Sequence, residues 1–118
     1  MSSLSEFFAS VGSNSDDAVA RLGGNEALVV CFVTKFLSDN SLSSLRSALE
    51  CGDSEAALRA AHTLKGVSGT LSFQRLYERV SSVNELLRSG ALDAARTAFP
   101  ALEKEYSLVI EALKNLEQ

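Results

Sequence analysis

The segment around His62 is the part of the chain whose residue types could do chemistry. His62 is the only histidine among 118 residues, and the pattern of the surrounding segment, from about 55 to 71, predicts a helix. Small and apolar positions in that segment recur at spacings of four and three, so they share one narrow helix face, and His62 lies roughly 140° from its centre. We therefore expect an imidazole that points to solvent, where its neutral nitrogen is a nucleophile near neutral pH.

Three neighbours on the same side of this predicted helix indicate what His62 does. Lys65 follows at i+3, Gly66 at i+4 and Gly69 at i+7, so all three can lie beside the imidazole or just along the helix from it. Each interior glycine costs a helix about 0.5–1 kcal/mol relative to alanine. We interpret the glycines as room for another protein's backbone, a close helix–helix crossing being the alternative. Lys65 can offset the charge of a phosphoryl group.

The rest of the sequence limits the chemistry to carrying a phosphoryl group. It contains no Walker-type Gly-Lys loop, no kinase Gly-rich loop and no acidic cluster for Mg²⁺, so the chain should not draw phosphate from ATP. A single histidine excludes a three-histidine zinc site and a two-histidine iron site within one subunit. An enzyme that uses His62 as a general base would need an orienting carboxylate and a concave pocket, which an outward-facing helix surface does not supply.

A run of residues that contains the histidine resembles the histidine phosphotransfer (HPt) domain of bacterial multistep phosphorelays. The run is Ala61-His62-Thr63-Leu64-Lys65-Gly66-Val67-Ser68-Gly69-Thr70-Leu71. The upstream residues that also fit are Arg21-Leu22-Gly23-Gly24-Asn25-Glu26, then Phe32 and Phe36-Leu37, then Gly52-Asp53. The resemblance covers about residues 15–116. It implies a phosphorelay intermediate without kinase activity, which takes a phosphoryl group from a receiver-domain aspartate and passes it to another receiver.

The resemblance also implies roles for individual residues. His62 corresponds to the phosphoryl acceptor, Lys65 to the residue that stabilises the phosphoryl group, and Gly66 to the position that leaves room for the receiver. Gly69 corresponds to a small position one turn further on, which we also assign to clearance for docking. These four residues form the predicted site.

Two residues just beyond this helix depart from the family's common pattern. Ser72 stands where glycine is frequent, and Phe73 stands where a small residue is frequent. Both lie at the turn after the acceptor helix, so the differences concern the local docking surface more than the chemistry. We take Phe73, together with Arg59 one turn before His62, as candidates for the docking surface.

The resemblance implies protein partners rather than a cofactor on this chain. We expect response-regulator receiver domains as partners, with a hybrid sensor kinase as a further candidate, and we expect the required Mg²⁺ to belong to the receiver. The chain can be a free-standing protein or a part of such a kinase. The alternative function is a helical interaction module that docks receiver or kinase domains without carrying phosphate. The intact set of His62, Lys65 and Gly66 argues against it, because a degenerate copy should lose the histidine first.

The composition and the spacing of apolar residues predict an all-α protein. Eighteen Leu, fifteen Ala, one Pro and no Trp favour helix, and no stretch alternates long enough for a strand. The expected helices cover about 25–36, 42–49, 55–71, 73–89 and 92–116, after two short ones before residue 24. Pro100 lies inside the last pattern, which predicts a kink there or two helices that meet.

These elements predict one HPt domain over residues 1–118. Long helices with short connections pack most simply as an antiparallel up-and-down four-helix bundle, here about 25–117, with the short helices of residues 1–24 as an N-terminal cap. The aromatic residues that recur at helical spacing should lie in its core. They are Phe32, Phe36, Phe73 and Tyr106.

The charge and the cysteine content exclude several classes of protein. A net charge of −4 and a pI of about 4.9 argue against a nucleic-acid surface. No apolar run approaches the roughly 18 residues of a membrane span. The N-terminus shows no signal peptide, so we expect a cytoplasmic protein. We also expect it to be a monomer. Cys31 and Cys51 are interpreted as inert thiols rather than a disulfide framework.

Overall fold

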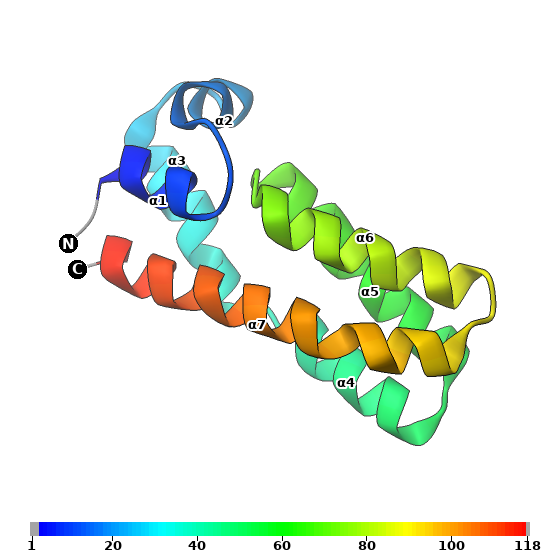
Figure 1. Cartoon of the computed structure of the whole chain (residues 1–118). Coiled ribbons are helices and arrows are strands. Elements are labelled where there is room, and N and C mark those ends of the chain that lie inside the picture. Colours follow the sequence, from blue (N-terminus) through cyan, green and yellow to red (C-terminus); the bar gives the residue numbers. More distant parts are fainter. Residues whose placement is uncertain (1–2, 118) are drawn as a thin grey trace.

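The structure, a computed structural model, describes residues 3–117 and consists there of helices and their connections (Figure 1). The elements are α1 (Leu4–Ser10), α2 (Ser15–Arg21), α3 (Glu26–Thr34), the 3₁₀ helix η1 (Lys35–Ser38), α4 (Ser41–Cys51), α5 (Ser54–Thr70), α6 (Gln74–Arg88) and α7 (Leu92–Glu117). The all-α class is confirmed, since the described residues contain no strand. Residues 1, 2 and 118 of the predicted domain lie outside the described residues. None of the helices within 3–117 has the length and apolar character needed to cross a membrane.

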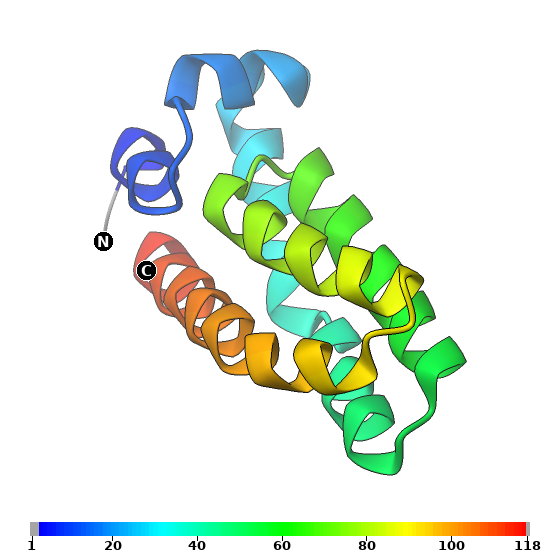
Figure 2. The same ribbon diagram turned by 45° about the vertical axis from the view of Figure 1, so that its right-hand side comes forward.

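Helices α4 to α7 pack in chain order, each against the next, and α4 also contacts α7 (Figure 2). Gly52 ends α4 with a φ of 75°, in the left-handed region that glycine adopts without strain, so α5 can begin two residues later. Each of these helices buries large apolar side chains. They include Leu45, Leu64, Leu76, Val80, Leu102, Val109 and Leu113.

Side-chain caps confirm the predicted starts of two helices. The Asn25 side chain accepts a hydrogen bond from the backbone N–H of Leu28 at 3.2 Å, and it begins α3. Asp53 accepts one from the N–H of Ala56 at 3.0 Å, and it begins α5. Such caps satisfy backbone donors that have no partner inside the helix. Asp53 thereby fixes the start of the helix that carries His62.

The last helix excludes one of the two forms predicted around Pro100. Leu92–Glu117 is one α-helix with Pro100 inside it, so the form with two separate helices is wrong. Proline removes one hydrogen bond from a helix interior. Pro100 is exposed, and on a solvent-facing side water can replace the lost partner.

Most of the aromatic residues assigned to the core do lie inside. Phe36 and Phe73 are buried, and their rings meet edge to face with centroids 5.1 Å apart. Tyr106 is partly buried beside Phe36, and its hydroxyl donates to the Asp39 carboxylate at 2.9 Å. Burial, followed by this hydrogen bond, raises the pKa of Tyr106 above its ordinary value, so the hydroxyl remains a donor.

The assignment of Phe32 to the core is wrong. Phe32 is 38% exposed and Leu28, one turn before it, is 51% exposed. Helix α3 packs against α7 and η1 through the face that carries the fully buried Val29 and Val33. The flank that carries Leu28 and Phe32 is left uncovered in this chain.

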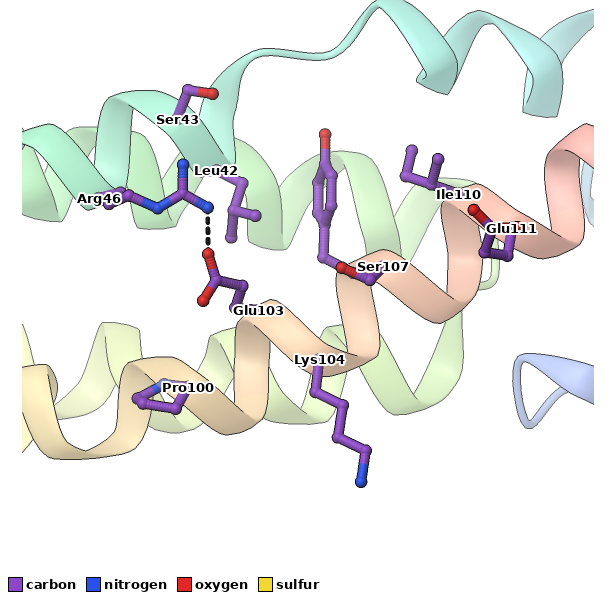
Figure 3. A pocket seen from close by; sticks show the side chains of 10 residues that line it. Leu42, Ser43, Arg46, Pro100, Glu103, Lys104, Ser107, Ile110 and Glu111 are labelled. Carbon is purple, nitrogen blue, oxygen red and sulfur yellow. Dashed lines mark hydrogen bonds and ion pairs between the residues drawn. The ribbon is translucent and has the colours of Figure 1, made fainter.

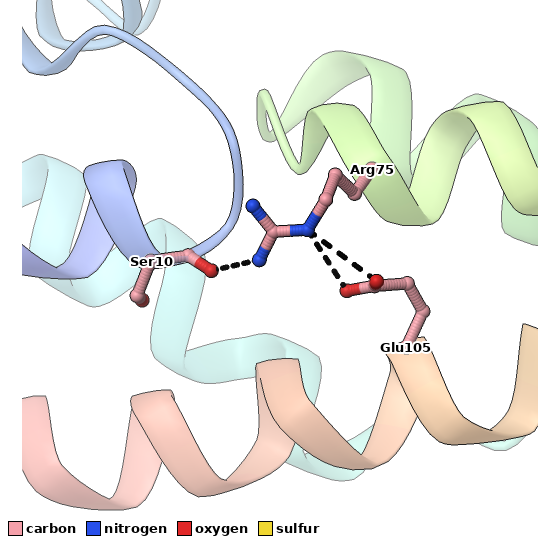
Figure 4. Close-up of polar contacts among 3 residues, drawn as sticks. All are labelled: Ser10, Arg75 and Glu105. Atoms are coloured by element: carbon pink, nitrogen blue, oxygen red, sulfur yellow. Dashed lines mark hydrogen bonds and ion pairs between the residues drawn. The ribbon is translucent and has the colours of Figure 1, made fainter.

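The N-terminal helices are attached to the start of α6. The guanidinium of Arg75, in the first turn of α6, donates to the carbonyl of Ser10 and, through Nε, to the Glu105 carboxylate of α7 at 3.3 Å (Figure 4). The backbone N–H of Arg75 also donates to the carbonyl of Val11 at 3.2 Å. One side chain therefore joins the end of α1 to two of the long helices.

A second attachment reaches the turn between α5 and α6. The guanidinium of Arg21, at the end of α2, donates to the Ser72 hydroxyl at 3.0 Å and to the Gly69 carbonyl at 3.2 Å. The Ser13 hydroxyl donates to the Ser72 carbonyl. Ser72 has a φ of 64°, the left-handed conformation that glycine favours. The left-handed backbone of this turn explains why glycine suits the position. Serine adds a hydroxyl that accepts a hydrogen bond from Arg21.

Substitutions at Ser72 should separate the backbone strain from the hydrogen bond. Ser72→Ala keeps a Cβ in the left-handed region and removes the acceptor for Arg21, so we expect it to lower the free energy of unfolding by about 1 kcal/mol. Ser72→Gly removes the same acceptor but relieves the strain, so it should be more stable than Ser72→Ala by about 1 kcal/mol. Urea unfolding of both variants measures the difference. Equal stability of the two would contradict the assigned strain.

Candidate functional site

His62 lies on the exposed side of α5, as the helical pattern predicts. The opposite face of α5 is buried and consists of Ala57, Ala61, Leu64 and Ser68. Ser68, the one polar member of that face, donates its hydroxyl to the Leu64 carbonyl at 2.8 Å, so its own donor is satisfied. The burial of the other face therefore orients the imidazole outward.

Two hollows meet at His62, which differs from the plain convex surface expected from the sequence. One hollow of about 550 Å³ lies between α5 and α6. It is lined by Leu58, Arg59, His62, Thr63, Lys65, Asn84 and Arg88. The other, of about 420 Å³, follows α5 toward its C-terminal end. It is lined by His62, Thr63, Gly66, Val67, Thr70 and Leu71.

The hollow between α5 and α6, called the cationic hollow below, gathers three positive charges around His62. Arg59 and Lys65 come from α5, and Arg88 comes from α6. Arg59 and Arg88 are exposed, whereas Lys65 is only partly exposed, less than its predicted position implied. No carboxylate belongs to the described lining of either hollow, so a general-base enzyme would lack an orienting acid here.

Two residues of the cationic hollow, Asn84 and Arg88, were missed in the sequence. Asn84 is 3% exposed, and its Oδ1 atom is buried without a hydrogen-bond partner among the described residues. The pattern of α6 contains a signal for it, because Asn84 interrupts the apolar positions Val80, Val83 and Leu87. A polar side chain on a buried face calls for a partner or a function.

The two glycines of the predicted site prove to be different. A Cβ on Gly66 would meet no atom within 4 Å, so the space above Gly66 is open. A Cβ on Gly69 would lie 3.1 Å from the Tyr77 ring of α6. The assignment of Gly69 to receiver clearance is therefore corrected: its missing side chain lets α5 and α6 approach each other. The role of Gly66 in docking remains a prediction.

Of the two proposed docking residues, Arg59 is exposed and Phe73 is not. Arg59 lines the cationic hollow with His62. Phe73 is 0% exposed, and its ring packs edge to face against Phe7 at 5.7 Å and against Phe36 at 5.1 Å. The assignment of Phe73 to a docking surface is wrong, because the left-handed turn at Ser72 leads directly into the core.

A third hollow, of about 550 Å³, lies between α4 and α7 (Figure 3). An ion pair of Arg46 and Glu103 spans it, with Pro100 and Lys104 on the α7 side. None of its lining residues belongs to the hollows at His62. It is therefore separate from the candidate site, as are the exposed free thiols of Cys31 and Cys51.

The fold and the site together define an all-helical protein whose one imidazole is open to another protein. The family model of the Hpt domain matches residues 34–115. The chain therefore belongs to the Hpt domain family, whose members carry phosphoryl groups on a histidine in two-component phosphorelays and interact with receiver domains. Hpt domains are in general phosphocarriers rather than enzymes. No curated protein and no solved structure matched the chain.

Proposed function

We propose that this chain is a phosphorelay intermediate that accepts a phosphoryl group from a receiver-domain aspartate on His62 and passes it to another receiver. The observation that carries this proposal is the position of His62. It is exposed where the cationic hollow meets the second hollow, which runs along α5 beside Gly66. Membership of the Hpt domain family supports it. The chain acts as a carrier without autokinase activity, whether free-standing or part of a hybrid sensor kinase.

The proposed transfer exchanges one bond to phosphorus for another. The lone pair of a neutral imidazole nitrogen of His62 attacks the phosphorus of the receiver's aspartyl phosphate. A nitrogen–phosphorus bond forms as the oxygen–phosphorus bond breaks, and the aspartate leaves with that electron pair as a carboxylate. The second transfer reverses these bonds on another receiver. Charge on the transferring oxygens is offset by this chain's cations and by Mg²⁺, which we assign to the receiver.

The arrangement of the long helices serves this transfer. We propose that α4 to α7 act as an antiparallel up-and-down four-helix bundle, within one domain of residues 1–118 that works as a cytoplasmic monomer. The short connections support the reversal of direction, because two or three residues allow a helix only to fold back beside its predecessor. Arg59, exposed beside His62, contributes to the receiver-docking surface.

Lys65 should affect the rate of transfer more than the fold. Lys65→Gln keeps most of the aliphatic stem and removes the charge, so we expect transfer in both directions to slow by roughly tenfold or more. The free energy of unfolding should change by less than about 0.5 kcal/mol. The control is Lys104→Gln, at an exposed position of α7 that does not line either hollow at His62. It also removes one positive charge, and it should leave the transfer rate unchanged. Equal transfer rates in the two variants would exclude Lys65 from the transfer.

The decisive experiment incubates the purified chain with receiver domains that have been phosphorylated by labelled acetyl phosphate. Phosphohistidine formation gives label on the chain that is lost in acid and stable in base. ATP alone should give none. A chain that binds receivers but takes up no such label is an interaction module, and the proposed function would then be wrong.

A further inference from the structure

The acceptor helix α5 ends in a turn that usually contains glycine. The N–H of Phe73 donates to the Ser68 carbonyl at 2.9 Å, and the N–H of Ser72 donates to the Gly69 carbonyl at 3.2 Å. These two bonds form a Schellman motif, in which Ser72 is the left-handed residue, with a φ of 64°. The other left-handed residues of the described part of the chain are Gly12, Gly23, Gly24, Gly52 and Gly90. Because a residue with a Cβ is strained in this conformation, the end of α5 is weaker than a glycine would make it.

The same end of α5 takes its positive charge from another helix. The C-terminus of a helix carries a partial negative charge, which a nearby cation stabilises. The last turn of α5, which lies wholly within the described residues, contains no basic side chain. Instead Arg21, at the end of α2, donates to the Gly69 carbonyl at 3.2 Å and to the Ser72 hydroxyl at 3.0 Å. One guanidinium therefore supplies both the cation and a bond to the strained residue.

This helix end also forms part of the second hollow at His62. Thr70 and Leu71 line that hollow together with His62 and Gly66, where a receiver is expected to approach. Thr70 is the last residue of α5, and Leu71 is its C-cap. A helix end that loses its capping bonds opens locally, so these two lining side chains would move. His62 lies about two turns earlier in the helix, where the intrahelical bonds remain.

We propose that Arg21 is a positioning residue for receiver docking, which acts by holding the last turn of α5 in place. This inference rests on the proposed function of His62. The guanidinium takes no part in phosphoryl transfer. Without it the last turn of α5 opens more often, and the second hollow loses part of its lining. A residue of the N-terminal helices, outside the matched residues 34–115, therefore sets part of the affinity for the receiver.

Receiver affinity and amide exchange, both measured on Arg21→Gln, test the proposal. We expect receiver binding to weaken by about three- to tenfold. The backbone N–H groups of Leu71, Ser72 and Phe73 should exchange with solvent at least about tenfold faster. Arg79→Gln removes one positive charge from an exposed position of α6 that lines neither hollow, and it should change both quantities by less than about twofold. A loss of affinity no larger than that of Arg79→Gln, or unchanged exchange at the helix end, overturns the proposal.

A second substitution separates positioning from a direct contact with the receiver. Arg21 is itself exposed, so a lost contact with the receiver would also lower the affinity. Ser72→Gly relieves the left-handed strain without restoring the charge. In the double variant Arg21→Gln/Ser72→Gly, we expect slow exchange at the end of α5 to return and the receiver affinity to come within about twofold of that of the parent chain. Affinity that stays low in the double variant would overturn the positioning role.

Labelling of His62 without a receiver separates this inference from the proposed function. Phosphoramidate, a small phosphoryl donor, reacts directly with an accessible histidine. We expect His62 to be labelled at the same rate in the parent chain and in Arg21→Gln, because it lies about two turns before the helix end. Slower labelling in Arg21→Gln would place Arg21 in the chemistry and overturn the positioning role. A parent chain that is labelled and binds receivers, with an Arg21→Gln variant that binds them equally well, would reject the inference and leave the proposed function intact.

Discussion

A His62→Gln variant is expected to take up no phosphoryl group from any receiver, while its melting temperature stays close to that of the parent chain. The loss should be complete, because His62 is the only imidazole in the chain and no other nucleophile is assigned to the site. The fold should be retained, because His62 is exposed and lies on the side of α5 opposite its buried face. Exposed substitutions usually change stability by less than about 0.5 kcal/mol.

Two measurements on the same sample decide this result. Labelling by a phosphorylated receiver reports the acceptor, and thermal unfolding followed by circular dichroism reports the fold. Base-stable label that survives in His62→Gln would show that another residue accepts the phosphoryl group. Loss of label together with a large fall in melting temperature would give His62 a structural role that its exposure does not predict.

A Gly66→Gln variant is expected to melt at the same or a higher temperature and to transfer phosphate at least about tenfold more slowly. Nothing lies within 4 Å of the Cβ that the variant adds, and replacing an exposed helical glycine stabilises a helix by up to about 1 kcal/mol. The added side chain would occupy the hollow along α5, one turn after His62, where the receiver is expected to approach. Misplacement of about 1 Å can cost a factor of about 100 in rate.

Gly69→Gln is the matched control for Gly66→Gln, one turn further along α5. Its new Cβ would come within 3.1 Å of the Tyr77 ring, so the ring or α6 must shift. We therefore expect a lower melting temperature for Gly69→Gln and a higher or equal one for Gly66→Gln. Receiver affinity should fall in the Gly66 variant. A Gly66→Gln protein that melts lower and transfers normally would make Gly66 a packing glycine as well.

The parts of the fold that depend on neighbouring residues could be predicted from the sequence. The starts of the helices predicted at about 25 and 55 depend on Asn25 and Asp53, and such a cap is made within four residues of the chain. The outward position of His62 followed from the spacing of Ala57, Ala61 and Leu64, because one helix face must be buried. Local hydrogen bonds and helical periodicity therefore account for much of the candidate site.

The errors concern contacts between helices, which periodicity does not specify. Phe32 and Phe36 are one turn apart and look equivalent in the pattern, but the neighbours of α3 cover only one flank and leave Phe32 exposed. Gly66 and Gly69 are equivalent in the sequence pattern, but a Cβ on Gly69 would meet the Tyr77 ring of α6 and a Cβ on Gly66 would meet nothing. Asn84 and Arg88 were not predicted either, because they line the hollow at His62 only through the packing of α6 against α5.

The attachment of the N-terminal helices has a consequence for where this protein can be divided. Three of the bonds from Arg21, Ser13 and Arg75 end on the carbonyls of Gly69, Ser72 and Ser10, and any residue type provides a carbonyl. These acceptors place little restriction on the residue types at their positions. The family match begins only at residue 34, after these N-terminal donors. A fragment trimmed to that boundary would uncover Phe73 and free the turn at the end of the phosphoacceptor helix. The segment that the family model matches, residues 34–115, is thus shorter than the segment that should be expressed as one protein, which includes the N-terminal helices.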